Sequence, residues 1–254
     1  MTDIVEDPVA ETRRILAAAD AASLPLRAVG GVAIAMVAPT IAQLQPTRSY
    51  HDIDLAAVAR SGTPVVSRFM TGLGYEAARG FNALNGAERL LFHDPGGRRV
   101  DVFIDTLRMC HVLRFAARLE LRASTLPAAD LVLSKLQIVE LTERDTQDLQ
   151  ALFADLALTD SDSDGIGRAR IRQVCGADWG WWRTVDDNLR RLSEAWEVRL
   201  AKAEPESAPA LGRAVERAND LRRELAACPK TVGWRIRAKV GARVRWYESP
   251  EEVR

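Results

Sequence analysis

The fold of this chain is decided by two stretches near its N-terminus, Arg27-Ala-Val-Gly-Gly-Val-Ala-Ile-Ala-Met36 and Arg48-Ser-Tyr-His-Asp-Ile-Asp-Leu55. They read as a strand, a Gly-Gly turn, a helix and a second strand with two aspartates. Because side chains alternate between the faces of a strand, Asp52 and Asp54 project from the same face. Neighbouring carboxylates repel each other, and a divalent cation such as Mg²⁺ relieves that repulsion. The glycines would let a phosphate approach backbone N–H groups at the start of the helix.

A third carboxylate comes from residues 89–105, where two apolar runs flank Asp-Pro-Gly-Gly and predict a β-hairpin. In the second strand of this hairpin, Asp101 lies within an apolar run, where an unpaired buried carboxylate costs roughly several kcal/mol. Three acids from adjacent strands are tolerable together around a metal. Asp105 lies on the same face nearer the strand end and competes with Asp101 for the third position. Without a third acid, Asp52 and Asp54 could also be charges at a sheet edge that prevent strands of different molecules from pairing.

The composition indicates a protein with a substantial hydrophobic core and no net electrostatic field. The chain has 254 residues, 47% of them hydrophobic, and a formal net charge of zero. Its cysteines, Cys110, Cys175 and Cys228, lack metal-ligand spacing, which indicates reduced, buried thiols. No apolar run approaches the roughly twenty residues that span a bilayer, and the acidic N-terminus does not resemble a signal peptide. We therefore expect a cytoplasmic protein without a membrane partner.

The periodicity divides the chain into an α/β (α+β) domain over residues 1–157 and a helical region over residues 158–254. In the first part, we expect a mixed sheet flanked by helices, and Pro39 should end or kink the helix that follows the glycines. The Asp- and Ser-rich stretch at 159–165 is the best linker. The expected helices are 8–22, 32–43, 64–73, 128–142, one that begins at 143, 179–202 and 209–227. The expected strands are 26–29, 52–58, 89–93, 98–105 and 119–125, with 75–84 as a strand followed by a loop.

These motifs together carry a resemblance. Gly-Gly, a helix, Asp-x-Asp on the next strand and a later strand acid resemble the nucleotidyltransferase superfamily of the polymerase-beta type. The segment from Lys135 to Leu149, with Arg144-Asp145-Thr-Gln-Asp148, is similar to the helical part of a subgroup that includes AbiEii and MenT-type toxin nucleotidyltransferases. The resemblance covers about residues 8–157. The residues after about 158 carry no such resemblance.

The resemblance implies an enzyme that transfers a nucleoside monophosphate from an NTP to an acceptor, in a Mg²⁺-dependent reaction that releases pyrophosphate. Asp52, Asp54 and Asp101 would be the catalytic and metal-binding residues of a two-metal site. The nucleotide phosphates would lie at the turn and against two cations. These nucleotide-binding residues are Gly30, Gly31, Arg48 and Lys135.

Several positions keep a second interpretation. Lys135 could extend to solvent from its apolar helix, and Asp148 could belong to a charge pattern on a helix surface. Gly31 stands where the superfamily usually has a serine whose hydroxyl donates to a phosphate, so backbone N–H groups would take over that role. The rival function is therefore a non-catalytic member that binds a nucleotide, RNA or a protein. A small-molecule acceptor, as in antibiotic adenylyltransferases, is a third option.

The C-terminal segment 230–245 holds six Lys or Arg residues and no acid, together with Trp234 and followed by Trp246. One interpretation is an RNA surface, tRNA included, with phosphate contacts from the cations and stacking from the aromatic rings. The alternative is a basic helix that packs on the acidic N-terminal domain through its tryptophans. The toxin–antitoxin resemblance also implies a protein antitoxin as a partner.

Overall fold

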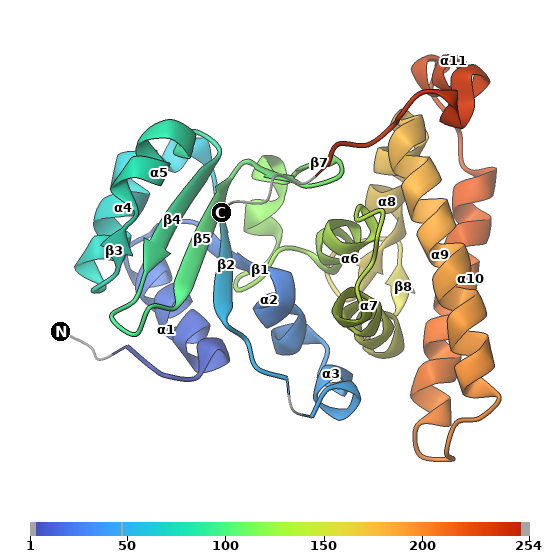
Figure 1. The fold of residues 1–254 in the computed structure, drawn as a ribbon, viewed down its shortest axis with the longest axis horizontal. Coiled ribbons are helices and arrows are strands. Elements are labelled where there is room, and N and C mark those ends of the chain that lie inside the picture. Colours follow the sequence, from blue (N-terminus) through green and yellow to red (C-terminus); the bar gives the residue numbers. More distant parts are fainter. Residues whose placement is uncertain (1–3, 47, 250–254) are drawn as a thin grey trace. The chain divides into compact units, whose positions relative to one another are not determined.

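The computed structural model describes residues 4–46 and 48–249 (Figure 1). The expectation about a signal peptide rests partly on residues 1–3, which lie outside the described residues. The chain forms two compact units, and each is described by itself. The first lies within Met1–Val37, Thr47–Leu107 and Arg114–Pro127; the second lies within Ala38–Pro46, Arg108–Leu113 and Ala128–Arg254.

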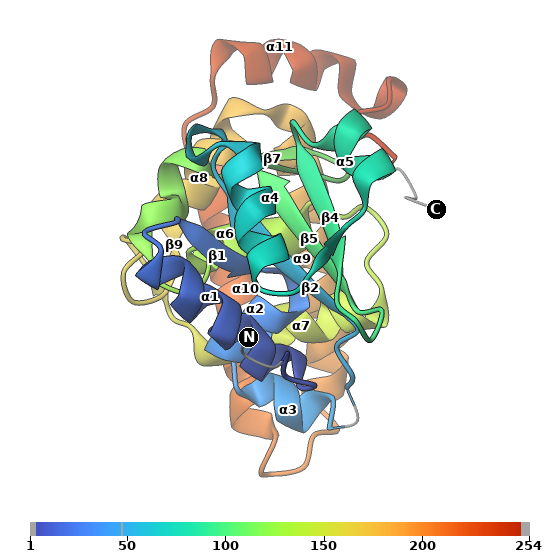
Figure 2. The same cartoon turned by 90° about the vertical axis from the view of Figure 1, so that its left-hand side faces the viewer.

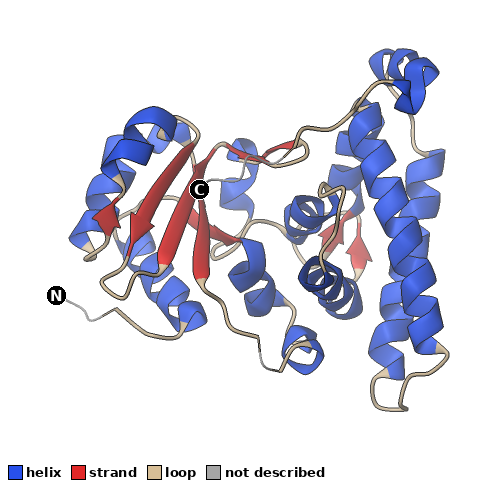
Figure 3. Ribbon diagram, viewed as in Figure 1, coloured by secondary structure: helices blue, strands red, loops and turns tan. Residues whose placement is uncertain are grey.

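The first unit contains a mixed five-stranded sheet in the order β1-β2-β5-β4-β3 (Figure 3). β2 pairs antiparallel with β1 and parallel with β5, and β4 pairs antiparallel with β5 and β3. One face carries Ile53, Leu55, Val100 and Val102, all fully buried. This confirms the mixed sheet that the period-two patterns predict. Its strands are β1 (Leu26–Val29), β2 (Asp52–Ala57), β3 (Glu76–Ala77), β4 (Arg89–His93) and β5 (Arg99–Ile104).

Helices flank this sheet, and the glycine-rich turn leads directly from β1 into a helix. The helix after the glycines ends at Val37, two residues before Pro39, as the proline predicts. Residues 79–85 form a helix rather than the expected loop, and residues 116–121 form a 3₁₀ helix rather than a strand. Only Thr125 bridges to the sheet there, at Ala28. The elements are α1 (Pro8–Ala21), α2 (Gly30–Val37), η1 (Ala59–Ser61), α4 (Thr63–Gly72), α5 (Arg79–Asn85) and η2 (Ala116–Leu121).

The second unit is mainly helical. Its longest helices, α9 and α10, pack against each other, and α7 packs against α10. Its core includes Trp196, which is fully buried and meets the ring of Phe153 edge-on at 6.2 Å between centroids. The helices are α3 (Thr40–Leu44), α6 (Ala128–Leu136), α7 (Glu143–Asp155), α8 (Arg168–Ala177), α9 (Trp179–Leu200), α10 (Ala208–Ala227) and α11 (Val232–Val240), with η3 (Gly241–Arg243).

The remaining strands are short. The expected linker at 159–165 lies between β8 (Leu158–Thr159) and β9 (Ile166–Gly167), which pair in parallel. β6 (Thr106–Arg108) pairs with β7 (Val112–Arg114). All three cysteines are buried and free. Among the described residues, no helix is long and apolar enough to cross a membrane.

The boundary between the units differs from the expected one at residue 157. α6 and α7 belong to the second unit, because their apolar faces pack on α8, α9 and α10. α3 joins them, since the backbone N–H and hydroxyl of Thr40 both donate to the carboxylate of Asp155, at 2.8 and 2.6 Å. The change of hydrophobic period at Pro127 therefore marks the boundary better than the polar linker does.

The burial of Trp196 predicts a large effect of its truncation. Trp196→Ala removes a fully buried ring and leaves a cavity against Phe153, so the free energy of unfolding of the second unit should fall by about 3–5 kcal/mol. Val198→Ala on the same helix is the matched control, because its side chain is 61% exposed. Urea unfolding measures both variants. Equal midpoints for the two would contradict this packing.

Candidate functional site

The parallel register of β2 and β5 brings two of the predicted acids side by side. Asp54 is the direct partner of Asp101, and Asp52 is the partner of Arg99. Because registered residues share a face, these four side chains lie on the face opposite the apolar one. Asp52 is exposed, Asp54 is half-buried and Asp101 is 3% exposed. The polar face therefore runs from solvent toward the interior of the first unit.

Gly30 brings the start of α2 against Asp54. Its φ is +70°, in the left-handed region that favours glycine, and a Cβ at this position would lie 2.2 Å from Oδ2 of Asp54. β1 supports the same approach, since Val29 pairs directly with Asp54. A larger residue at 30 would therefore disturb both the turn and the carboxylate.

Arg48 covers the next residue of the same turn. A Cβ at Gly31 would lie 2.6 Å from the guanidinium of Arg48, and that guanidinium stacks over the ring of Tyr50 at 4.6 Å from its centroid. The predicted phosphate cation thus lies at the N-terminus of α2, where backbone N–H groups and the helix dipole also favour an anion. Three of the four predicted nucleotide-binding residues come together here: Gly30, Gly31 and Arg48.

Asp101 has cationic partners that the sequence analysis missed. Nε of Arg89 donates to one carboxylate oxygen and Nε of Arg99 donates to the other, each at 2.8 Å. Arg99 lies two residues before Asp101 on the same strand face, and this spacing was a signal for the contact. Arg89 comes from β4 and lies over the rings of Phe81 and Phe103, at 5.8 and 5.2 Å. These two arginines compensate the buried charge of Asp101.

The residues that would hold a metal fit it only in part. Carboxylates are ligands that Mg²⁺ takes, but both oxygens of Asp101 already accept from arginines. Within residues 4–46 and 48–249, no group of three His, Cys, Asp or Glu residues is arranged to hold a metal ion. Asp52 and Asp54 remain as a carboxylate pair on one strand face, and Asp54 lies against Gly30 at the start of α2.

The structure distinguishes the two competitors for the third position. Asp105 follows the end of β5 with a φ of +59°, and its carboxylate accepts from the backbone N–H of Ala59 at 3.0 Å. Its own backbone N–H donates to Ala57, at the end of β2 away from Asp54. Asp105 therefore stabilises a turn, and Asp101 is the acid beside Asp54.

Lys135 belongs to the second unit, whereas the other predicted nucleotide-binding residues belong to the first. Its ammonium group contacts Asp145 at 2.8 Å and Asp148 at 2.9 Å. Burial opposes the charge of Lys135, but the two carboxylates outweigh it and raise its pKa above the ordinary value. Lys135 therefore does not extend to solvent; it neutralises two acids of α7.

The two acids have different local roles. Asp145 forms a capping box with Thr142 at the start of α7, and its pKa is lowered by Lys135 and Thr142 despite its burial. Asp148 is fully buried, so its interpretation as a residue on a helix surface was wrong. The apolar packing of α6 on α7 covers it, and sequence spacing alone did not show which side of α7 faces inward.

Two of the three histidines, His51 and His111, are bound to hydroxyl groups of neighbouring residues. Nε2 of His51 hydrogen-bonds the hydroxyl of Ser49 at 2.9 Å, and His51 is exposed. His111 is buried in the second unit, where it stacks on Trp181 and hydrogen-bonds Thr184. Burial lowers the pKa of His111 to about 4, so its ring is neutral near pH 7.

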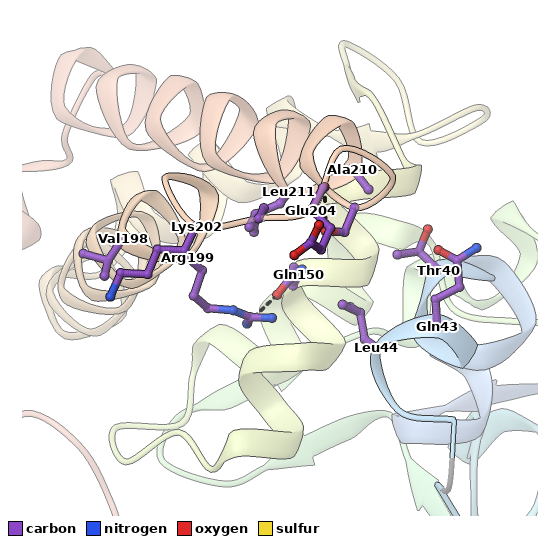
Figure 4. A pocket seen from close by; sticks show the side chains of 12 residues that line it. Thr40, Gln43, Leu44, Gln150, Val198, Arg199, Lys202, Glu204, Ala210 and Leu211 are labelled. Atoms are coloured by element: carbon purple, nitrogen blue, oxygen red, sulfur yellow. Dashed lines mark hydrogen bonds between the residues drawn. The ribbon is translucent and has the colours of Figure 1, made fainter.

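The second unit also contains an open pocket of about 500 Å³ between α3, α7, α9 and α10 (Figure 4). Arg199 reaches across it and donates to the side-chain oxygen of Gln150 at 2.9 Å. Lys202 and Glu204 bring charges of opposite sign to its lining. This mixed lining does not select one ligand class, and none of the predicted site residues lines the pocket.

Comparisons with known proteins give no assignment. No protein-family model matches the chain, and no curated protein matches it. The acid face and the turn beside it are therefore the features that bear on function.

The two glycines of the turn predict unequal effects of the same substitution. Gly30→Ala imposes a left-handed backbone on alanine and forces its Cβ into Asp54, so we expect a loss of about 1–3 kcal/mol in unfolding free energy. At Gly31 the added Cβ comes closest to the flexible end of Arg48 and lies at ordinary contact distance from the ring of Tyr50, so Gly31→Ala should cost less than about 1 kcal/mol. Urea unfolding compares the pair; a larger loss for Gly31→Ala would contradict the described turn.

Lys135 predicts a stability effect rather than a nucleotide effect. Lys135→Ala leaves Asp148 buried without this cation, so unfolding free energy should fall by about 3–5 kcal/mol at pH 7. Lys202→Ala, at an exposed position, is the control. The folded state lowers the pKa of Asp145 below its ordinary value of 3.8. The contribution of Asp145 to the unfolding free energy is therefore complete above pH 3.8 and is lost as the pH falls through the lower folded-state pKa. The deficit of the variant should therefore shrink in acid, whereas a phosphate-binding lysine would change nucleotide affinity with stability unaltered.

Proposed function

We propose that the chain is a Mg²⁺-dependent nucleotidyltransferase that moves a nucleoside monophosphate from an NTP to an acceptor. The observation that carries this proposal is the register of Asp54 beside Asp101, next to the Gly30 turn. This arrangement joins a carboxylate face to the N-terminus of a helix, and Arg48 lies at that N-terminus. Acids for a cation and donors for a triphosphate are thereby adjacent, which suits phosphoryl chemistry.

The protein's own groups suggest how the nucleotide would be held. Backbone N–H groups at the start of α2 would donate to phosphate oxygens, and the guanidinium of Arg48 would add a bidentate donor. Gly31 provides no hydroxyl, so these groups carry the contacts of the usual serine. The left-handed Gly30 keeps side-chain atoms out of the approach to Asp54.

Asp52 and Asp54 would hold Mg²⁺, and Asp101 would join them only after Arg89 and Arg99 release it. When bound, the metal supplies positive charge that stabilises the attacking and leaving oxygens. In the transfer itself, an acceptor oxygen bonds to the α-phosphorus and the bond to the pyrophosphate oxygen breaks. A released Asp101 carboxylate would accept the proton of the acceptor hydroxyl.

The second candidate function is a non-catalytic nucleotide-, RNA- or protein-binding member of the same fold. The arginine pair favours it, because Arg89 and Arg99 neutralise Asp101 without a metal. In that case Asp101 is structural, and the turn binds an anion without transferring it. Magnesium-dependent NTP binding separates the two functions.

The acceptor classes that fit this reaction are RNA, protein and small molecules, and a protein antitoxin is the partner that the resemblance implies. Incubating the protein with each labelled NTP, Mg²⁺ and cellular RNA, protein and metabolite fractions would identify the acceptor class. Label in one fraction that disappears with EDTA supports transfer. The absence of label in all three fractions supports the binding function.

The acid pair predicts a loss of chemistry without a loss of fold. Asp52→Ala and Asp54→Ala should each lower the transfer rate at least about a hundredfold, because each removes a carboxylate from the charge-stabilising site. Circular dichroism and the urea midpoint should stay close to those of the parent, since Asp52 is exposed and Asp54 is half-buried. Transfer of labelled nucleotide is the measurement.

Asp160→Ala is the matched control, because Asp160 is an exposed acid in the loop between β8 and β9. Its activity should equal that of the parent. Full activity in both strand variants would overturn the enzyme proposal. Calorimetry that detects no binding of NTP with Mg²⁺ to the parent protein would do the same.

A further inference from the structure

The basic C-terminal segment forms α11, which lies beyond the end of α9 in both views of the second unit (Figures 1 and 2). Its aromatic side faces inward. The ring of Trp234 meets that of Trp182 on α9 at 5.3 Å between centroids, and Trp246 meets Trp179 at 5.8 Å. Both tryptophans therefore pack on α9, within the second unit, whereas the alternative drawn from the sequence expected their partner in the N-terminal domain.

Two of the six cations help to fix this packing. The guanidinium of Arg237 lies 4.7 Å from the ring centroid of Trp179 and donates to the carbonyls of Gly241 and Val244. Lys230 contacts the sulfur of Cys228 at 2.8 Å and lies over the ring of Trp234. Arg237 and Lys230 hold one side of α11 in place, so its opposite side is presented at the surface.

The opposite side carries an aliphatic ridge, defined by Val232, Ile236 and Val240. These residues are 70%, 61% and 40% exposed. Their spacing of four residues places them in one row along the helix. Val244, just beyond η3, is 58% exposed and adds to the apolar surface. Apolar side chains in a row at i, i+4 and i+8 are the anchors of a helix that docks into a groove.

Cations accompany the ridge without any acid nearby in the sequence. Arg235, Lys239, Arg243 and Arg245 are exposed. Residues 225–247 contain no Asp or Glu, although the whole chain has equal numbers of acidic and basic residues. The next acid, Glu248, pairs with Arg108 at 3.0 Å. Charge complementarity therefore selects an occupant that is anionic as well as apolar.

We propose that the outer side of α11 is a docking surface for a partner protein with an apolar groove rimmed by Asp and Glu. Val232, Ile236 and Val240 enter the groove, while Arg235 and Lys239 pair with its acidic rim. This inference does not depend on nucleotidyl transfer by the first unit. A different protein surface carries it, and its test measures binding alone.

Other anionic occupants fit the surface less well. Stacking on single-stranded RNA needs exposed aromatic rings, but Trp234 and Trp246 turn toward α9. An anionic bilayer favours helices with Trp, Phe or Leu on the apolar side, whereas this ridge holds only Val and Ile. Valine and isoleucine are stiff side chains that lose little conformational freedom when they enter a shaped protein groove.

The test uses the full-length protein with a photo-crosslinking amino acid at Ile236, irradiated in its native host cells. Leu84, an aliphatic residue that is 87% exposed on α5, carries the crosslinker in the matched control. We expect a polypeptide adduct from position 236 and none of that mass from position 84. The crosslinked polypeptide, identified by mass spectrometry, is then produced separately and titrated against the purified parent protein.

In that titration, Ile236→Asp and the double variant Arg235→Glu/Lys239→Glu should each weaken binding at least about tenfold. Reversal of acidic rim residues on the partner should restore affinity for the double variant. Unchanged circular dichroism shows that the variants fold. An adduct that nuclease removes, an adduct of lipid mass, a second copy of this chain, a partner whose affinity survives both variants, or no adduct at position 236 overturns the proposal.

Discussion

The parallel pairing of β2 with β5 is the constraint on which the candidate site depends. It sets Asp54 against Asp101, so a half-buried carboxylate and a buried one share one face of the sheet. Like charges at this spacing require compensation, because neither is fully hydrated. Two arginines supply it to Asp101: Arg99 from the same strand, β5, and Arg89 from the neighbouring strand, β4. The chemistry of this face therefore depends on whether an arginine or a bound metal ion neutralises each carboxylate.

The turn between β1 and α2 places groups that favour an anion next to the carboxylates. Gly30 lets the backbone pass against the carboxylate of Asp54, and Arg48 brings a cation over Gly31. A polyphosphate at this position would meet backbone donors and a guanidinium on one side and carboxylates on the other. Such a ligand needs a divalent cation between its own charge and the acids. This electrostatic requirement links the proposed nucleotide to the proposed metal.

The second unit uses charge differently, since its buried ionic groups stabilise packing. Lys135 neutralises Asp145 and Asp148 where α6 meets α7, and Arg170 pairs with the fully buried Asp130 at 3.0 Å. In α11, some cations stabilise packing and others lie at the surface. Arg237 is fixed over Trp179, whereas Arg235 and Lys239 remain at the surface beside the aliphatic ridge. The same residue types thus support packing on one side and recognition on the other.

The local elements and the acid face follow from the residue pattern alone. Period-two runs predicted that Asp52, Asp54 and Asp101 lie on strand faces. Glycine and proline predicted the turn at Gly30 and the helix end before Pro39. Strand faces, turns and helix ends can be predicted in this way because they depend on residues that are neighbours in the sequence. The packing of the elements decided which residues lie opposite one another: the register of Asp54 with Asp101, the contact of Arg89 with Asp101, the burial of Asp148 and the place of Lys135 in the second unit. Those partners lie on other elements, and no local pattern encodes the distance between two segments until they pack.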